Sequence, residues 1–157
     1  MNAKLLFFAF LFVLSTALGS KDLPKALLIG DSISLGYTPH VVAALKGKVE
    51  VIHHRGNAQH TGMGLKMLDR WVGKTQWDVI HFNWGLWDLC YRHPQSKEQG
   101  RRDKKRGNLT TSLEQYEKNL GQLAARLKMT KAKLIWAHTT AVPKGEAGRK
   151  LGDDDKY

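Results

Sequence analysis

The sequence predicts an α/β protein with a mostly parallel sheet covered by helices on both faces, a doubly wound, flavodoxin-like three-layer α/β/α sandwich. Four short apolar segments alternate with segments whose apolar residues recur at helical spacing. The chain has 157 residues, of which 42% are hydrophobic, enough for one domain with a core and too few for two ordinary ones. Because parallel strands need right-handed crossovers, we expect helices on both faces of the sheet.

The predicted strands are short runs rich in Val, Ile and Leu. In a flavodoxin-like sheet, the first and third strands are neighbours at the point where the winding direction reverses. Ser32, just after the first strand, is therefore expected to lie near residues 83–88, just after the third. The four predicted strands cover residues 26–29, 49–52, 79–82 and 134–137.

Two helices are predicted between the first three strands. The first is expected to have Thr38 as its N-cap, Pro39 at its first position and Gly47 at its end. The second carries an apolar stripe over residues 65–72 and ends at Gly73.

The strongest helical pattern precedes the fourth strand. Leucines and a tyrosine recur at helical spacing over residues 113–127, and Ser112 and Gln115 are placed as a capping box. Residues 143–157 then form a tail rich in glycine and charge, with no fifth strand or final helix. The fourth strand would then have an open edge, whereas natural sheets usually cover or blunt such an edge. We therefore expect a fold that lacks its last strand and helix.

Residues 1–19 have the pattern of an export signal, and residues 20–157 that of the domain. Lys4 supplies the positive start, residues 5–14 the apolar centre, and residues 17–19 a small-x-small cleavage site. About ten apolar residues are too few to span a bilayer, although an uncleaved anchor is the alternative. We expect a secreted or periplasmic protein with no membrane span after cleavage.

The chain is basic, with a formal net charge of +11, which favours anionic partners without naming one. Residues 97–106 concentrate this charge in a long polar segment, interpreted either as a solvated loop or as a polyanion-binding or substrate-gating loop. No aromatic residue interrupts the segment, so we expect no specific nucleic-acid partner. The single cysteine, Cys90, excludes an intrachain disulfide, and the oligomeric state is left open.

A serine follows the first predicted strand at the sheet edge where α/β proteins place their ligands. The segment Gly30-Asp31-Ser32-Ile33-Ser34 resembles the first sequence block of the SGNH, or GDSL-type, esterases and acylhydrolases. The family's second block falls on residues 57–61, and its third, Gly-x-Asn-Asp, on residues 85–88. The resemblance runs from about Lys25 to Arg149.

The resemblance implies a serine ester hydrolase in which Ser32 attacks the ester carbonyl and its backbone N–H helps to bind the oxyanion. Serine needs a base to accept its proton, and the oxyanion needs preorganised donors. A helix N-cap or turn serine is the alternative for Ser32, and a loop-capping carboxylate is the alternative for Asp88. The candidate oxyanion or substrate-binding residues are Asp31, Asn57, Gln59, Asn83, Gly85, Trp87 and Asp88.

Two positions depart from the family pattern. Gln59 stands where the second block has glycine, and Trp87 stands where the third block has asparagine. Asn83 replaces that asparagine only if its side chain points into the cleft. Loss of one oxyanion donor typically lowers the rate about a hundredfold to a thousandfold.

The family's base belongs to an Asp-x-x-His block after a fifth strand, and none of the seven histidines reproduces it. His138 follows the fourth strand and is either near the sheet's active edge or in an ordinary polar position. Without a base, we expect reduced or absent hydrolysis of the small ester or acylated carbohydrate that the resemblance implies. The alternative is a non-catalytic glycan- or anion-binding protein on the same fold, with Trp84 and Trp87 beside the ligand.

No cofactor is expected. His53 and His54 are adjacent in a predicted strand, so their side chains are expected to point to opposite faces and not to share a metal.

Overall fold

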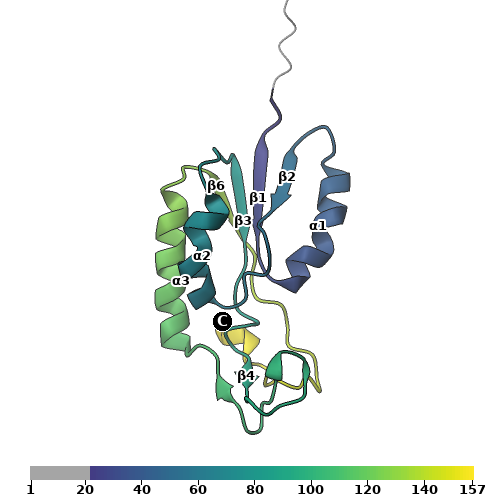
Figure 1. Cartoon of the computed structure of the whole chain (residues 1–157), viewed down its shortest axis with the longest axis vertical. Helices are drawn as coiled ribbons and strands as arrows, with labels where there is room; N and C mark the ends of the chain where they lie inside the picture. The colour runs from purple at the N-terminus through teal and green to yellow at the C-terminus, as the bar shows by residue number, and fades with distance from the viewer. Residues whose placement is uncertain (1–21) are drawn as a thin grey trace, which may run out of the picture.

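Four parallel strands form the central sheet (Figure 1). The structure is a computed structural model and is described for residues 22–157, so the export signal predicted for residues 1–19 lies outside the described residues. The order of the sheet is β2-β1-β3-β6, which confirms the predicted arrangement of the four strands. The strands are β1 (Lys25–Ile29), β2 (Glu50–His53), β3 (Val79–Phe82) and β6 (Lys133–Trp136).

Helices cover both faces of the sheet, as the alternating pattern predicts. Figure 1 shows α1 (Ser32–Ala44) on one side of the sheet, with α2 (Thr61–Val72) and α3 (Leu113–Lys128) on the other. The three layers confirm the predicted α/β/α sandwich. The carboxyl ends of β1 and β3 lie side by side because Ile29 pairs with Phe82.

The start of α1 corrects the prediction for the first helix. The helix begins at Ser32 rather than at Pro39, and its N-cap is Asp31, whose Oδ1 accepts the Ile33 N–H at 2.9 Å. Pro39 lies inside the helix and Thr38 does not cap it, because the Thr38 hydroxyl donates back to the Ser34 carbonyl at 2.6 Å. The Asp31 cap supports the first turn before the Thr-Pro pair is reached.

The other two helices have the ends that the sequence predicts. α2 ends at Val72, followed by Gly73 at a φ of +61°. Ser112 caps α3 by accepting the Gln115 N–H at 3.2 Å. The reciprocal half of the capping box does not form, since the Gln115 side chain donates to Asn119 Oδ1 at 2.7 Å.

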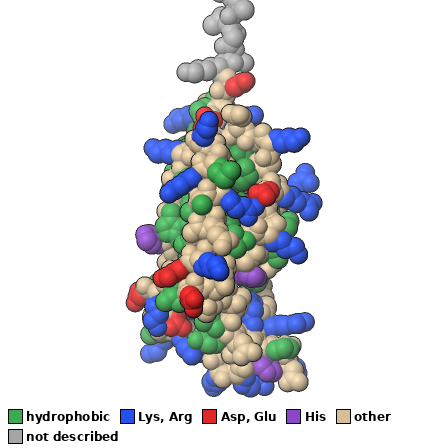
Figure 2. Space-filling view, turned by 90° about the vertical axis from the view of Figure 1, so that its left-hand side faces the viewer, with side chains coloured by type: hydrophobic (Ala, Val, Ile, Leu, Met, Phe, Trp, Pro, Cys, Tyr) green, Lys and Arg blue, Asp and Glu red, His purple; other side chains and the backbone are tan. Residues whose placement is uncertain are grey.

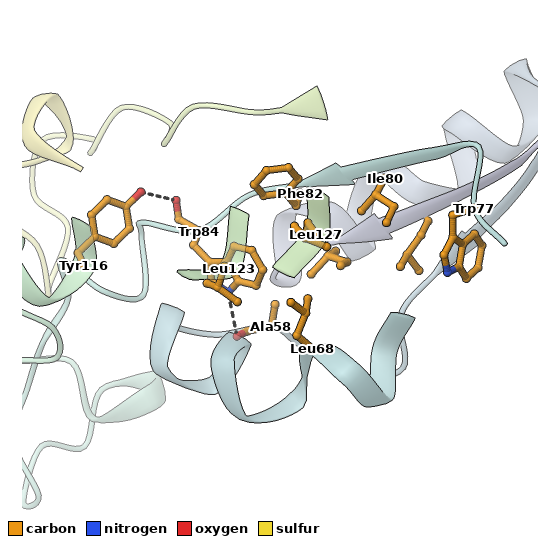
Figure 3. Packing of buried hydrophobic residues seen from close by; sticks show 11 residues of the cluster. Ala58, Leu68, Trp77, Ile80, Phe82, Trp84, Tyr116, Leu123 and Leu127 are labelled. Carbon is orange, nitrogen blue, oxygen red and sulfur yellow. Dashed lines mark hydrogen bonds between the residues drawn. The ribbon is translucent and has the colours of Figure 1, made fainter. Parts of the chain in front are cut away.

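The hydrophobic core lies between the sheet and the α2–α3 layer (Figure 3). Trp84 is 1% exposed, and its indole N–H donates to the Ala58 carbonyl at 3.4 Å. The Tyr116 hydroxyl donates to the Trp84 carbonyl at 3.2 Å, so both amphipathic rings are buried with a polar partner. The core consists of Leu27, Ile29, Ala58, Leu68, Trp77, Ile80, Phe82, Trp84, Tyr116, Leu123 and Leu127.

The basic segment after β3 is folded against the C-terminal tail. It contains β4 (Tyr91–Arg92), the short 3₁₀ helix η1 (Gln99–Arg101) and β5 (Asn108–Leu109), with β4 and β5 antiparallel. The Tyr91 N–H donates to the Gly148 carbonyl at 2.6 Å. The tail ends in η2 (Asp154–Lys156), and within residues 22–157 no strand pairs with the outer edge of β6.

Charged side chains are spread over the surface. Figure 2, which views the molecule from the side of α2 and α3, shows Lys and Arg side chains distributed over this face and at its lower end. Within residues 22–157, every helix is too short or too polar to cross a membrane.

Candidate active site

Ser32 lies at the carboxyl edge of the sheet, where the sequence predicts the reactive serine. It is the first residue of α1, directly after the turn that leaves β1, and its side chain is exposed. Because Asp31 is the N-cap, the Ser32 hydroxyl does not serve as the helix cap. Ser32 therefore does not have the N-cap role that was one of its alternative interpretations.

Ser32 opens onto a cavity of about 460 Å³. The cavity lies between the start of α1, the loop after β3, the β4–η1 segment and the tail. Leu86 and Trp87 in its lining confirm the expectation that Ser32 meets the segment after β3. The lining residues are Asp31, Ser32, Ile33, Leu86, Trp87, Arg92, Gln99, Gly100, Arg102 and Arg149.

Hydrogen bonds from two histidines and a serine hold the turn before Ser32. Ser34 is 3% exposed, and its hydroxyl lies 2.7 Å from the Asp31 carbonyl and 2.7 Å from His53 Nε2. His54 Nε2 lies 2.9 Å from the Gly30 carbonyl, and since a carbonyl only accepts, His54 donates. Both histidines thus orient the backbone that carries Ser32.

Gly30 is required at this turn by the close approach of Ser34. A Cβ at position 30 would lie 2.7 Å from Ser34 Oγ and 2.8 Å from Ser34 Cβ, closer than such contacts allow. The glycine therefore lets the first turn of α1 pack directly on the end of β1.

Asn57 and Gln59 lie outside the cavity lining. Gln59 has a left-handed backbone conformation, with φ of 51°, at the position where the family has glycine. The Gln59 N–H donates to Asn57 Oδ1 at 2.8 Å, so these two candidates bind each other. In this conformation the Gln59 amide is not available as an oxyanion donor.

Asn83 also bonds within the protein. Its side-chain amide donates to the carbonyls of Ala137 at 2.6 Å and His138 at 3.1 Å, which ties the end of β3 to the end of β6. Asn83 does not line the Ser32 cavity and does not replace the asparagine of the third block there. His138 is exposed and is likewise absent from the lining.

Gly85 and Trp87 begin the loop that forms one wall of the cavity. Gly85 is buried with φ of +145°, and a Cβ there would collide with the Thr139 hydroxyl, so this close approach requires glycine. Trp87 lines the cavity, and its ring packs under Arg92, whose Cζ lies 4.2 Å from the ring centroid. Trp87 therefore offers an aromatic face rather than the amide of the family pattern.

Asp88 is fully buried beneath the site. Its Oδ1 accepts the Thr61 hydroxyl at 2.6 Å and the Thr61 N–H at 2.9 Å, and Asn119 Nδ2 donates to the same hydroxyl at 3.0 Å. Burial raises the pKa of Asp88, although the hydrogen bonds from Thr61 oppose that shift. The carboxylate supports the N-terminus of α2, which matches the loop-capping alternative for this residue.

No histidine lines the Ser32 cavity within residues 22–157. The expectation that His53 and His54 point to opposite faces is wrong, since their rings stack with centroids 4.6 Å apart and an interplanar angle of 27°. β2 ends at His53, so the strand alternation no longer applies at His54. In the described part of the chain, no three His, Cys, Asp or Glu side chains gather as metal ligands would.

Sequence reasoning missed the three arginines that line the cavity. Arg92, Arg102 and Arg149 are far apart along the chain and meet because the tail pairs with the β4–η1 segment. The basic character of residues 97–106 was visible in the sequence, but its position beside Ser32 was not.

No protein-family model and no curated protein matches the sequence. Solved structures of esterases do match. A lipase/acylhydrolase from Enterococcus faecalis superposes with a TM-score of 0.61 at 18% identity over 85% of this chain and 67% of that chain. The acetyl xylan esterase AlAXEase superposes with a TM-score of 0.58 at 18% identity over 75% of this chain and 59% of that chain.

A GDSL-like lipase from Bacteroides thetaiotaomicron superposes with a TM-score of 0.50 at 15% identity over 71% of this chain and 47% of that chain. The chain thus spans between about half and two thirds of the length of these three proteins. The likeness of fold agrees with the block resemblance around Ser32. The chain therefore has the fold of the SGNH, or GDSL-type, hydrolases.

Proposed function

We propose that this protein is a serine ester hydrolase in which Ser32 is the nucleophile and small esters, such as acetylated carbohydrates, are the substrates. The observation that carries the proposal is the exposure of Ser32 at the N-terminus of α1, on the wall of a cavity of about 460 Å³. The same fold in solved esterases and acylhydrolases supports it.

In this proposal, Ser32 Oγ attacks the ester carbonyl carbon and forms a tetrahedral oxyanion. The first N–H groups of a helix have no acceptor within the helix, so the Ser32 N–H is the donor placed to stabilise that oxyanion. Collapse breaks the ester C–O bond, releases the alcohol and leaves an acyl group on Ser32. Water then attacks the acyl-enzyme, releases the acid and restores the hydroxyl.

The proton of Ser32 needs an acceptor for this sequence to be fast. Among the described residues that line the cavity, the one carboxylate is Asp31, and its Oδ1 already accepts the Ile33 N–H. We therefore propose slow turnover for the 157-residue chain. Asn57, Gln59 and Asn83 do not add an oxyanion donor while they keep their present hydrogen bonds.

The test compares the chain with its Ser32→Ala variant on p-nitrophenyl acetate and on a fluorophosphonate that labels activated serines. We expect slow hydrolysis that the variant loses, and a single covalent adduct that peptide mass spectrometry places on Ser32. Equal hydrolysis by both proteins, with no adduct on Ser32, would overturn the assignment. A fast rate that depends on Ser32 would overturn the slow turnover instead.

We also propose that the chain is exported and cleaved after Gly19, on the pattern of residues 1–19. Expression of the full chain in a secreting bacterial host, followed by N-terminal sequencing, tests this. A mature N-terminus at Ser20 outside the cytoplasm supports export, whereas an intact N-terminus retained inside the cell contradicts it.

A further inference from the structure

Three arginines from separate segments line the cavity beside Ser32. Arg92 belongs to β4, Arg102 directly follows η1, and Arg149 lies in the tail after β6. Like charges repel, so gathering three guanidinium groups is unfavourable unless negative charge offsets them. Asp31 and Glu146 supply two carboxylates, which leaves an excess of one positive charge around the cavity.

Two of the arginines are held in place by one buried carboxylate. Glu146 Oε1 accepts from Arg102 Nη1 at 2.9 Å and from Arg149 Nη1 at 3.0 Å, while its Oε2 accepts the Gly148 N–H at 2.7 Å. The side chains of Glu146 and Arg149 are 9% and 13% exposed. The Arg149 Nε–H also donates to the Leu86 carbonyl at 2.5 Å. These contacts fix the guanidinium groups before any ligand arrives, which lowers the entropy cost of binding.

Arg92 differs from the other two because no carboxylate in the described chain pairs with it. It donates to the Gly100 carbonyl and lies over the Trp87 ring. Burial lowers the pKa of Arg92, and the positive charges of Arg149 and Arg102 act in the same direction. Among the three arginines, the half-buried guanidinium of Arg92 is therefore stabilised most by an added anion.

The guanidinium groups keep donors for a ligand. An arginine has five N–H donors, and hydrogen bonds within the described chain use one on Arg92 and two each on Arg102 and Arg149. A carboxylate or a sulfate can accept two such bonds at once, which adds directional specificity to the charge.

We propose that the Ser32 site takes esters that carry an anionic group, a carboxylate or a sulfate, close to the ester bond. Arg92, Arg102 and Arg149 bind the anionic group, and Trp87 packs against the uncharged part of the substrate. The inference rests on the proposed function because it places the ester carbonyl at Ser32.

The kinetic test uses three acetate esters that differ in charge: 4-acetoxybenzoate, its neutral methyl ester, and 4-acetoxybenzenesulfonate. Each kcat/KM is divided by the rate constant for hydroxide hydrolysis of the same ester, which removes differences in leaving-group reactivity. We expect the anionic esters to be preferred about tenfold or more, with the preference falling at high salt. The carboxylate and sulfonate esters show which anion geometry the site favours.

Variants then assign the preference to the cavity. R92Q is expected to reduce the ratio of anionic to neutral kcat/KM toward one, and R92K to keep part of it because the charge remains. The matched control is R70Q, which removes one arginine from the exposed surface of α2, outside the Ser32 cavity, and is expected to leave the ratio unchanged. If R92Q does not fold by circular dichroism, the ratio of anionic to neutral kcat/KM measured with R92K decides. A ratio below that of the native chain supports the assignment, and an unchanged ratio contradicts it.

A binding measurement separates this inference from the proposed function. Calorimetric titration of the Ser32→Ala variant is expected to show 4-acetoxybenzoate binding about tenfold more tightly than its methyl ester. Equal affinity for 4-acetoxybenzoate and its methyl ester would overturn the anionic preference but not the proposed hydrolase activity. Corrected rates that are equal for the anionic and neutral esters and unchanged in R92Q would do the same. Tight anion binding without any Ser32-dependent hydrolysis would overturn the hydrolase and support an anion-binding protein.

Discussion

Ser34 Oγ lies 2.7 Å from Nε2 of His53, and this contact joins the first turn of α1 to the neighbouring edge strand β2. The His53 Nδ1–H donates to the His54 carbonyl at 2.6 Å, so the imidazole is held at both nitrogens. Ser34 Oγ also lies 2.7 Å from the carbonyl oxygen of Asp31, the residue before Ser32. The contact therefore supports the position of the exposed serine without touching the cavity.

Replacing Ser34 with alanine removes a buried hydroxyl and leaves its partners unsatisfied. We expect Ser34→Ala to lower the free energy of unfolding by about 1–3 kcal/mol. Ser32→Ala is the matched control because Ser32 is exposed, and its effect is expected to stay within about 0.5 kcal/mol. Urea denaturation of both variants measures the difference, and equal stabilities would contradict the role given to Ser34.

Replacing glycine with alanine is expected to have opposite effects on stability at two positions in or beside α1. Gly30→Ala places a methyl group 2.7 Å from Ser34 Oγ and is expected to lower the free energy of unfolding by about 1–3 kcal/mol. Gly36 lies within α1, and a methyl group at this position would meet no atom within 4 Å, so Gly36→Ala is expected to raise stability by about 0.5–1 kcal/mol. Thermal unfolding measures both, and a tolerated Gly30→Ala would show that the turn has more room than the structure gives it.

Asp88 makes stability depend on pH in a direction that follows from its burial. Its pKa is raised above the ordinary 3.8, so the folded state holds a proton that the unfolded state has already lost. The stability due to this proton is present below the unfolded pKa and is lost as pH rises through the folded pKa. We expect the unfolding free energy of the native chain, relative to Asp88→Asn, to fall as pH rises from the ordinary pKa of 3.8 through the raised pKa of the folded state.

The Asp88→Asn variant also weakens the contact with Thr61, because an amide nitrogen replaces one acceptor oxygen. We expect a loss of about 1–3 kcal/mol at a pH where Asp88 is ionised. Urea denaturation across the pH range measures both effects. A stability difference that does not vary with pH, or that grows with rising pH, would contradict the raised pKa.

Tyr116 and Tyr157 are expected to lose their phenolic protons at a higher pH than an ordinary tyrosine does. Burial raises the pKa of Tyr116 and of Tyr157 to about 12, and the charge of Asp88 adds to both shifts. Because the folded pKa values exceed the unfolded value of 10.0, the stability from the neutral phenols is lost as pH rises from 10.0 towards 12. Tyr157→Phe is expected to make this alkaline loss shallower.

Absorbance titration of phenolate formation checks the tyrosine prediction. The native chain is expected to show two of its four tyrosines ionising near pH 12, and Tyr157→Phe one fewer. Complete ionisation near pH 10 in the folded protein would contradict it.

The strands, their order and two of the helices were predictable because their signals are local. Runs of apolar residues mark buried parallel strands, and Ser112 and Gly73 mark helix ends by capping and by positive φ. The start of α1 was not predictable in this way, because Asp31 and Thr38 are both good N-caps and the sequence does not show which one bonds to the helix. Packing of Ser34 against Gly30 and His53 favours the earlier start.

The candidate site was predictable only in part. Ser32 and Trp87 meet as strand order implies, since β1 and β3 end side by side. Asn57 and Asn83 carry plausible donors in the sequence, but their side chains bond to Gln59 and to the backbone after β6. A hydrogen-bonding residue type does not reveal which partner it will find in the folded chain.

By itself, the sequence determined the fold class and the position of Ser32 at the edge of the sheet, because both follow from short-range patterns of apolar residues and from the connectivity of parallel strands. Only the tertiary structure decided what surrounds that serine. The tail packs against β4 and brings Arg149 and Glu146 to Arg92 and Arg102, and such contacts depend on chain segments far apart in sequence. The charge of the cavity is therefore a property of the packed chain and not of any one segment.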